Sequence, residues 1–126
     1  MTFKNLMIIK AIVCLSFGIL LVFVPGVLMD FLGTSLGPGG TFLGRVYGAG
    51  LFGTLMLTWF AKNAAESEAR RPILLHLFVY DAIGLIVTVL AVISGVLNAL
   101  GWGIVAVYLV ITLGSGYLLT TKPSTA

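Results

Sequence analysis

Charged side chains are scarce in this chain of 126 residues, of which seven are Lys or Arg, four are Asp or Glu, and 60% are hydrophobic. A soluble domain carries roughly 25% charged residues. Such a low charged fraction excludes an ordinary water-soluble domain, because it could not cover the surface, and it predicts a membrane protein. Four membrane helices of about 20 residues each would use up the chain and leave no room for a soluble catalytic domain.

Cysteine and histidine occur once each, as Cys14 and His76. A single cysteine excludes an intramolecular disulfide and a thiolate metal cluster within the chain, and we expect Cys14 to be a small buried or lipid-facing hydrophobe. His76 could ligate a haem or a chlorophyll, but a haem held by two histidines of this chain is impossible. A plain interfacial or hydrogen-bonded histidine is the simpler interpretation, so we predict no metal site and no cofactor.

Catalytic motifs are missing too. The chain contains no G-x-x-x-x-G-K-[ST] phosphate loop, no His-Glu-x-x-His, and no two carboxylates at similar depth in the predicted helices. The net charge of +3 comes from scattered residues without a basic run, so we predict no nucleic-acid partner. We predict no catalytic residue and disfavour an enzyme; a membrane enzyme that uses Asp81 and His76 remains a third alternative for the function.

Helix-breaking residues divide the hydrophobic sequence into four long segments. Pro25 ends the first one, because proline cannot continue the hydrogen-bond ladder of a helix. Residues 27–32 could form a short interfacial turn of helix before a turn-rich connector, and Pro72 suits the first turn of the third helix. We predict an all-α, integral membrane four-helix bundle. It forms one domain over residues 1–126, with helices at about 6–24, 41–61, 72–95 and 102–120 and a polar loop at 62–71.

Basic residues collect on one side of this predicted bundle: Lys4, Lys10, Lys62, Arg70, Arg71 and Lys122. The connectors on the opposite side contain Asp30 but neither Lys nor Arg. Cytoplasmic loops of membrane proteins are enriched in Lys and Arg. We therefore predict that both termini and the 62–71 loop are cytoplasmic, with the chain in the plasma (inner) membrane.

Asp81 and Lys10 lie within predicted membrane helices, where an ionisable group costs ~2.5–3.5 kcal/mol. Asp81 lies ~13 Å along the third helix from its start, and Lys10 enters the first helix from the same side. Their depths match, which predicts a structural ion pair between Lys10 and Asp81. Two alternatives stay open: a protonated, hydrogen-bonded Asp81, or a proton or ligand site that Asp81 forms with Tyr80 or His76.

Helical spacing places Asp81, Gly84, Thr88 and Ala91 on one face, which we expect to turn toward the other helices. Arg45 lies near the outer end of the second helix. It either snorkels to the outer interface and pairs with Asp30, or contacts a lipid phosphate, a quinone carbonyl or a partner chain. The candidate binding residues are Asp81, Tyr80, His76 and Arg45.

Two patterns concern helix packing. Small residues recur four apart, Gly44 with Gly48 and Ala49 with Gly53, a spacing that lets helix backbones approach closely in lipid. The segments 26–33 (GVLMDFLG) and 95–101 (GVLNALG) also resemble each other. They are either two similar turns that arose independently or the traces of a duplicated hairpin.

Several stretches carry a resemblance: Phe23-Val24-Pro25-Gly26, Gly44-Arg45-Val46-Tyr47-Gly48-Ala49, Glu68-Ala69-Arg70-Arg71, and residues 95–102. On these, most of the chain resembles a broad group of small, uncharacterised bacterial four-helix membrane proteins, whose motifs carry no assigned chemistry. The topology more distantly resembles the DoxX-like proteins, a likeness of fold that transfers no active residues. Small multidrug-resistance transporters have a glutamate in the first helix where this chain has Lys10, which argues against that family.

The leading functional prediction is a non-enzymatic scaffold or accessory subunit, which packs against a larger membrane complex or forms a homo-oligomer. It rests on the missing catalytic motifs and on 16 glycines, which suit close helix contacts. The alternative is binding or transport of a lipid, a quinone or another small hydrophobic molecule in a cavity near Asp81. In either case the predicted partners are membrane lipids and a membrane protein or a second copy of the chain.

Overall fold

Five helices make up the computed structural model, which describes residues 1–65 and 68–121. They are α1 (Phe3–Phe23), α2 (Pro25–Phe31), α3 (Pro38–Ala61), α4 (Arg70–Ile93) and α5 (Gly101–Thr120). The predicted all-α class is confirmed, and the short α2 occupies the stretch where a turn of helix was expected. Lys122, which entered the argument on orientation, lies outside the described residues.

Local chemistry explains where several helices begin and end. The Thr2 hydroxyl accepts a hydrogen bond from the Asn5 backbone N–H (3.1 Å), so α1 begins at Phe3, earlier than predicted. Pro38 opens α3, where its missing N–H has no cost. Gly33 (φ 81°) and Gly95 (φ 83°) follow the ends of α2 and α4 in the left-handed conformation that glycine adopts without strain.

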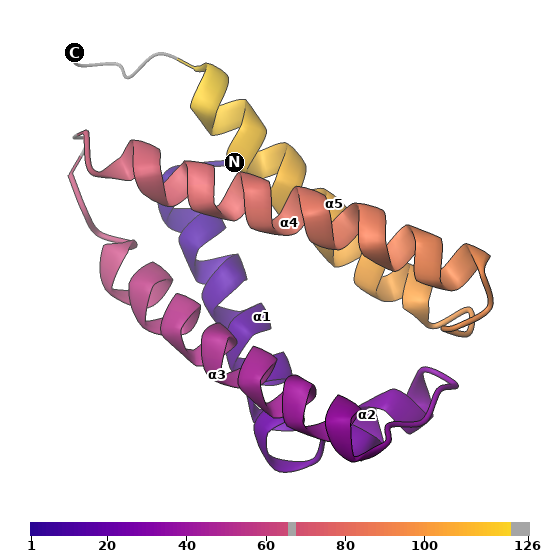
Figure 1. Ribbon diagram of the computed structural model, residues 1–126. Coiled ribbons are helices and arrows are strands. Elements are labelled where there is room, and N and C mark those ends of the chain that lie inside the picture. Colours follow the sequence, from indigo (N-terminus) through magenta and orange to yellow (C-terminus); the bar gives the residue numbers. More distant parts are fainter. Residues whose placement is uncertain (66–67, 122–126) are drawn as a thin grey trace.

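The helices form two antiparallel hairpins (Figure 1). In the first hairpin α1 packs along α3, with α2 at the turn; in the second, α4 packs along α5. The start of α1, the end of α3, the start of α4 and the end of α5 lie at one end of the molecule, which we call the terminal end. Residues 24–37 and 94–100 lie at the opposite, connector end.

The two hairpins touch at both ends. At the terminal end, buried apolar side chains from α1, α4 and α5 form a core of Phe3, Leu6, Met7, Leu74, Leu77 and Ile111. At the connector end, the Asn98 backbone N–H donates to the Leu32 carbonyl (2.8 Å), and the Asn98 side-chain amide donates to the Phe31 carbonyl (3.0 Å). These contacts join the two segments that resemble each other in sequence, although residues 26–31 are helical and residues 95–98 are not.

Of the two predicted pairs of small residues, one lies at a helix contact and the other is exposed. Gly48 faces α1, where a Cβ would lie 2.8 Å from Val22 Cγ2 and 3.0 Å from the Val22 backbone nitrogen. Ala49 and Gly53 are exposed, and the space around Gly53 is open. The first pair is therefore used for the close approach of α1 and α3, and the second is not used within the described residues.

Three helices, α1, α4 and α5, are long and apolar enough to cross a membrane. Helix α3 is as long as α4, 24 residues, but it is not among the three; it contains Arg45 and six glycines, none of which is strongly apolar. Large apolar side chains also cover the outside of the molecule, among them Phe60 (75% exposed) and Ile93 (70% exposed). The length and hydropathy of three helices thus agree with the prediction of a membrane protein. That α3 also crosses the membrane stays a prediction.

Candidate binding cavity between the two hairpins

A cavity of about 530 Å³ lies between the hairpins, and all five helices contribute to its wall. On α1 the lining residues are Lys10, Val13, Phe17 and Leu21, which succeed one another at intervals of three or four and so share one face over ~16 Å. Leu28 and Met29 of α2 line the cavity at the connector end. Most of the wall is apolar, and its polar groups gather on a few residues.

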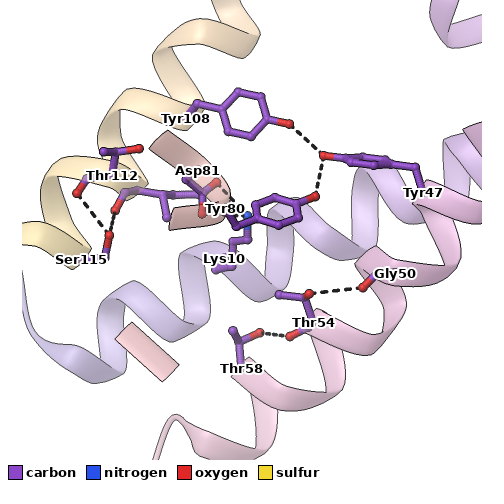
Figure 2. Close-up of polar contacts among 11 residues, drawn as sticks. Lys10, Tyr47, Gly50, Thr54, Thr58, Tyr80, Asp81, Tyr108, Thr112 and Ser115 are labelled. Carbon is purple, nitrogen blue, oxygen red and sulfur yellow. Dashed lines mark hydrogen bonds and ion pairs between the residues drawn. The ribbon is translucent and has the colours of Figure 1, made fainter. Parts of the chain in front are cut away.

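The charged part of the wall is a buried ion pair between the two hairpins. Lys10 Nζ on α1 lies 2.8 Å from Oδ1 and 3.1 Å from Oδ2 of Asp81 on α4, and each residue is 1% exposed (Figure 2). The ammonium also lies 4.3 Å from the centre of the Tyr80 ring, within the range of a cation–π contact. The structure thus brings together the two residues whose depths predicted a pairing.

Three tyrosine hydroxyls form a second polar cluster, which we call the tyrosine triad: Tyr47 of α3, Tyr80 of α4 and Tyr108 of α5. The Tyr80 hydroxyl donates to that of Tyr47 (2.5 Å), and the hydroxyls of Tyr47 and Tyr108 lie 2.8 Å apart. All three residues line the cavity, and the rings of Tyr47 and Tyr80 stack with their centres 6.2 Å apart. Figure 2 shows the hydroxyls converging from both hairpins.

Gly84 makes room for the triad. A Cβ at this position would lie 2.5 Å from Tyr108 Cε1 and 2.7 Å from Cζ, so no larger residue fits while the ring keeps its place. Three of the four residues expected on the inward face of α4 lie inward, because Asp81 and Thr88 are buried and Gly84 packs on α5, while Ala91 is half-buried. Gly84, about one turn after Asp81 on α4, therefore leaves the space that the Tyr108 ring occupies.

The other two candidate binding residues lie outside the cavity. His76 is exposed and does not line it, although its ring is tilted against that of Tyr80 with the centres 5.8 Å apart. Arg45 is exposed as well, and residues 1–65 and 68–121 hold no ion pair between Arg45 and Asp30. Of the four candidates, the structure brings Tyr80 and Asp81 to one site and leaves His76 and Arg45 apart from it.

Tyr47 and Tyr108 are the residues of this site that sequence reasoning missed. In the sequence, Tyr47 stands out only as part of a glycine-rich stretch, and Tyr108 lies in an apolar segment without any motif. A usable signal exists, because a tyrosine in the middle of an apolar helix needs a hydrogen-bond partner for its hydroxyl. Each of the three tyrosines is separated by at least seven residues from the nearest end of its helix.

The chemistry available here is hydrogen bonding and electrostatics. Within the described part of the chain, no group of three His, Cys, Asp or Glu residues could hold a metal ion. Comparisons with protein-family models, with curated proteins and with solved structures find no significant match. The resemblance to small bacterial four-helix membrane proteins therefore stays a prediction, and the functional argument rests on the cavity.

Proposed function

We propose that this chain is an integral membrane protein that binds a small, mostly apolar molecule, such as a lipid or a quinone, in the cavity between its hairpins. The observation that carries the proposal is the cavity itself. Its volume, about 530 Å³, falls in the range of roughly 300–1,000 Å³ that is typical of sites for small molecules. A tightly packed interior would have excluded this function.

The composition of the wall supports the proposal further. Binding sites for small molecules combine a predominantly apolar lining with a few polar groups that fix the orientation of the ligand. Here the polar groups are the Lys10–Asp81 pair and the tyrosine triad, while Val13, Phe17, Leu21 and other apolar side chains form the rest of the wall. An elongated apolar molecule with one polar end would match this distribution.

Filling part of the cavity is expected to weaken binding strongly. Ile104 of α5 lines the cavity, so Ile104→Trp would occupy part of its volume. Val110, on the same helix, is 48% exposed and lies outside the lining, so Val110→Trp is the matched control. Saturable binding of radiolabelled 2-tridecanone to the purified chain in detergent should fall at least tenfold in the first variant and stay near the wild-type value in the second. Equal binding by both variants would contradict the proposed location.

We also propose that α3 crosses the membrane with the other three long helices, and that the terminal end faces the cytoplasm. Lys4, Lys62, Arg70 and Arg71 lie at the terminal end, and the connectors at the other end carry neither Lys nor Arg. Such an imbalance favours a cytoplasmic terminal end. The Arg70 guanidinium also donates to the Ala64 carbonyl and lies over the Phe3 ring, which links the 62–69 connector to α1.

Labelling of single cysteines on intact cells tests this orientation. In a Cys14→Ala background, a membrane-impermeant maleimide should label Ser35→Cys and Ser94→Cys, whose positions are exposed at the connector end. Asn63→Cys, exposed at the terminal end, should be labelled only after the cells are permeabilised. Labelling of Asn63→Cys alone on intact cells would reverse the orientation, and labelling of Ser35→Cys and Asn63→Cys without Ser94→Cys would contradict the crossing of α3.

The predicted role of an accessory subunit receives less support than ligand binding. That prediction rests on the missing catalytic motifs and on the high glycine content, and many of the glycines contact other parts of the chain. Those with a neighbouring helix or connector side chain within contact distance include Gly18, Gly44, Gly48, Gly84, Gly114 and Gly116. Close contacts within and between the two hairpins thus account for these glycines without a partner protein.

A further inference from the structure

The cavity presents no unpaired charge to a ligand. Lys10 and Asp81 are the charged residues in its wall, and their side chains face each other at 2.8 Å. The ammonium has three N–H groups; the two carboxylate oxygens and the face of the Tyr80 ring surround it. An ionic ligand would find no unpaired counter-charge in this apolar wall and would lose its hydration there, so the wall suits a neutral molecule.

The tyrosine triad has one hydroxyl proton more than it uses. Each tyrosine hydroxyl has one O–H donor, and the three hydroxyls form two hydrogen bonds with one another. Tyr80 donates to Tyr47, so its proton is used. If Tyr47 donates to Tyr108, the unused proton is on Tyr108; if Tyr108 donates to Tyr47, the unused proton is on Tyr47. In both arrangements one donor on the cavity wall lacks an acceptor within the triad.

An unused donor on a mostly apolar wall favours a ligand that brings an acceptor, because an unmade hydrogen bond costs free energy. Thr88 adds a second hydroxyl to the wall. It is 9% exposed, and its side chain makes no hydrogen bond with the described residues, unlike those of Thr54 and Thr58, which donate to carbonyls of their own helix. The wall thus has two hydroxyl donors, one in the tyrosine triad and one on Thr88, that no described residue of the protein accepts.

From this arrangement we infer that the ligand presents a neutral, hydrogen-bond-accepting oxygen, such as a ketone or ester carbonyl, to the unused donor of the tyrosine triad, with its apolar part along α1 toward α2. The inference rests on the proposed function, because it names the ligand class for the same cavity. A carbonyl of this kind occurs both in free ketones and quinones and in the ester groups of lipids.

Three uncharged probes of similar length test the inference on the full chain purified in detergent: 2-tridecanone, methyl laurate and tridecane. A ligand that binds the folded state raises the thermal unfolding midpoint, so a titration yields the affinity of each probe. We expect the ketone or the ester to bind about three- to tenfold more tightly than tridecane, the range that one neutral hydrogen bond supplies. Preference for the ketone would indicate a free carbonyl compound, and preference for the ester would indicate a lipid.

Variants of the triad sharpen the test. Replacing all three tyrosines by Phe removes every hydroxyl, so the carbonyl probes should lose their advantage over tridecane. Tyr108→Phe alone should keep it, because Tyr80 and Tyr47 then form one hydrogen bond and still leave one unused donor. Tyr117→Phe, at an exposed position outside the lining, is the control.

The outcomes separate the two proposals. Equal affinity of the wild-type chain for all three probes would overturn the inference on the carbonyl and leave the binding of apolar molecules intact. Absence of saturable binding by all three would overturn the proposed function itself. An unchanged carbonyl preference in the triple variant would assign it to another group than the triad. The wild-type comparison decides the inference even where the triple variant does not fold.

Discussion

Asp81→Asn is expected to lower the free energy of unfolding by about 3–5 kcal/mol, one of the two largest effects predicted for a single substitution in this chain. The substitution removes the carboxylate that faces Lys10 at 2.8 Å and leaves an ammonium unpaired in a site where both residues are 1% exposed. Breaking a buried ion pair by removal of one partner has costs of this size. Thermal and denaturant unfolding in mild detergent would measure the loss.

The double substitution distinguishes a direct ion pair from two independent buried groups. Lys10→Met alone should also destabilise the chain, because it leaves the Asp81 carboxyl without its partner. Lys10→Met combined with Asp81→Asn should cost less than the sum of the two single losses, by about 1–3 kcal/mol, because residues in contact are energetically coupled. Strictly additive losses would contradict the pairing.

Asp30→Asn is the matched control for the change in charge. Asp30 is exposed and belongs to no ion pair within the described residues. Its substitution should change the free energy of unfolding by no more than about 0.5 kcal/mol. A loss for Asp30→Asn as large as that for Asp81→Asn would mean that the detergent-solubilised chain responds to net charge and not to the buried pair.

The Lys10–Asp81 contact shows which part of the site follows from the sequence. In a membrane helix the rise per residue converts a position into a depth, and two ionisable groups of opposite sign at similar depth have few alternatives to each other. The same reasoning placed Asp81, Gly84 and Thr88 on one inward face of α4. Depth and helical face are local properties, so one sequence is enough to predict them.

The tyrosine triad could not be predicted in the same way. Its hydroxyls come from three helices, and their meeting depends on how the first hairpin lies against the second. Tyrosine is also common at membrane interfaces, so a single tyrosine does not point to an interior site. His76 illustrates the opposite error: it is close to Asp81 in sequence, yet it lies on the exposed side of α4.

The arrangement of the helices was predictable to a lesser degree than their existence. Prolines and glycines marked the ends of the long helices, although the sequence prediction placed the start of α3 after Pro38 and thus overlooked its suitability as a first helical residue. A bundle of four helices was expected. The structure consists of two hairpins joined at both ends, with a cavity between them. The packing of one hairpin on the other depends on contacts between side chains of different helices, and the periodicity within a single helix does not predict such contacts.

Gly48→Leu is expected to separate α1 from α3 and to destabilise the chain by about 3 kcal/mol, at the upper end of the usual cost of overpacking. A Cβ on Gly48 would lie 2.8 Å from Val22 Cγ2, 3.0 Å from the Val22 backbone nitrogen and 3.1 Å from Leu21 Cβ. Two of these three atoms belong to the backbone or lie next to it, so a rotamer change cannot relieve the clash. The helices themselves must move apart.

This movement has a consequence for the cavity, because Tyr47 directly precedes Gly48 on α3 and joins the triad. Gly48→Leu should therefore weaken the binding of 2-tridecanone as well as lower the unfolding midpoint. Gly53→Leu is the matched control on the same helix, since a Cβ there meets no atom within 4 Å. It should leave both the unfolding midpoint and the binding near their wild-type values. Equal losses in the two variants would contradict the packing of α3 on α1 through Gly48. They would also contradict the argument that this packing positions Tyr47 in the cavity wall.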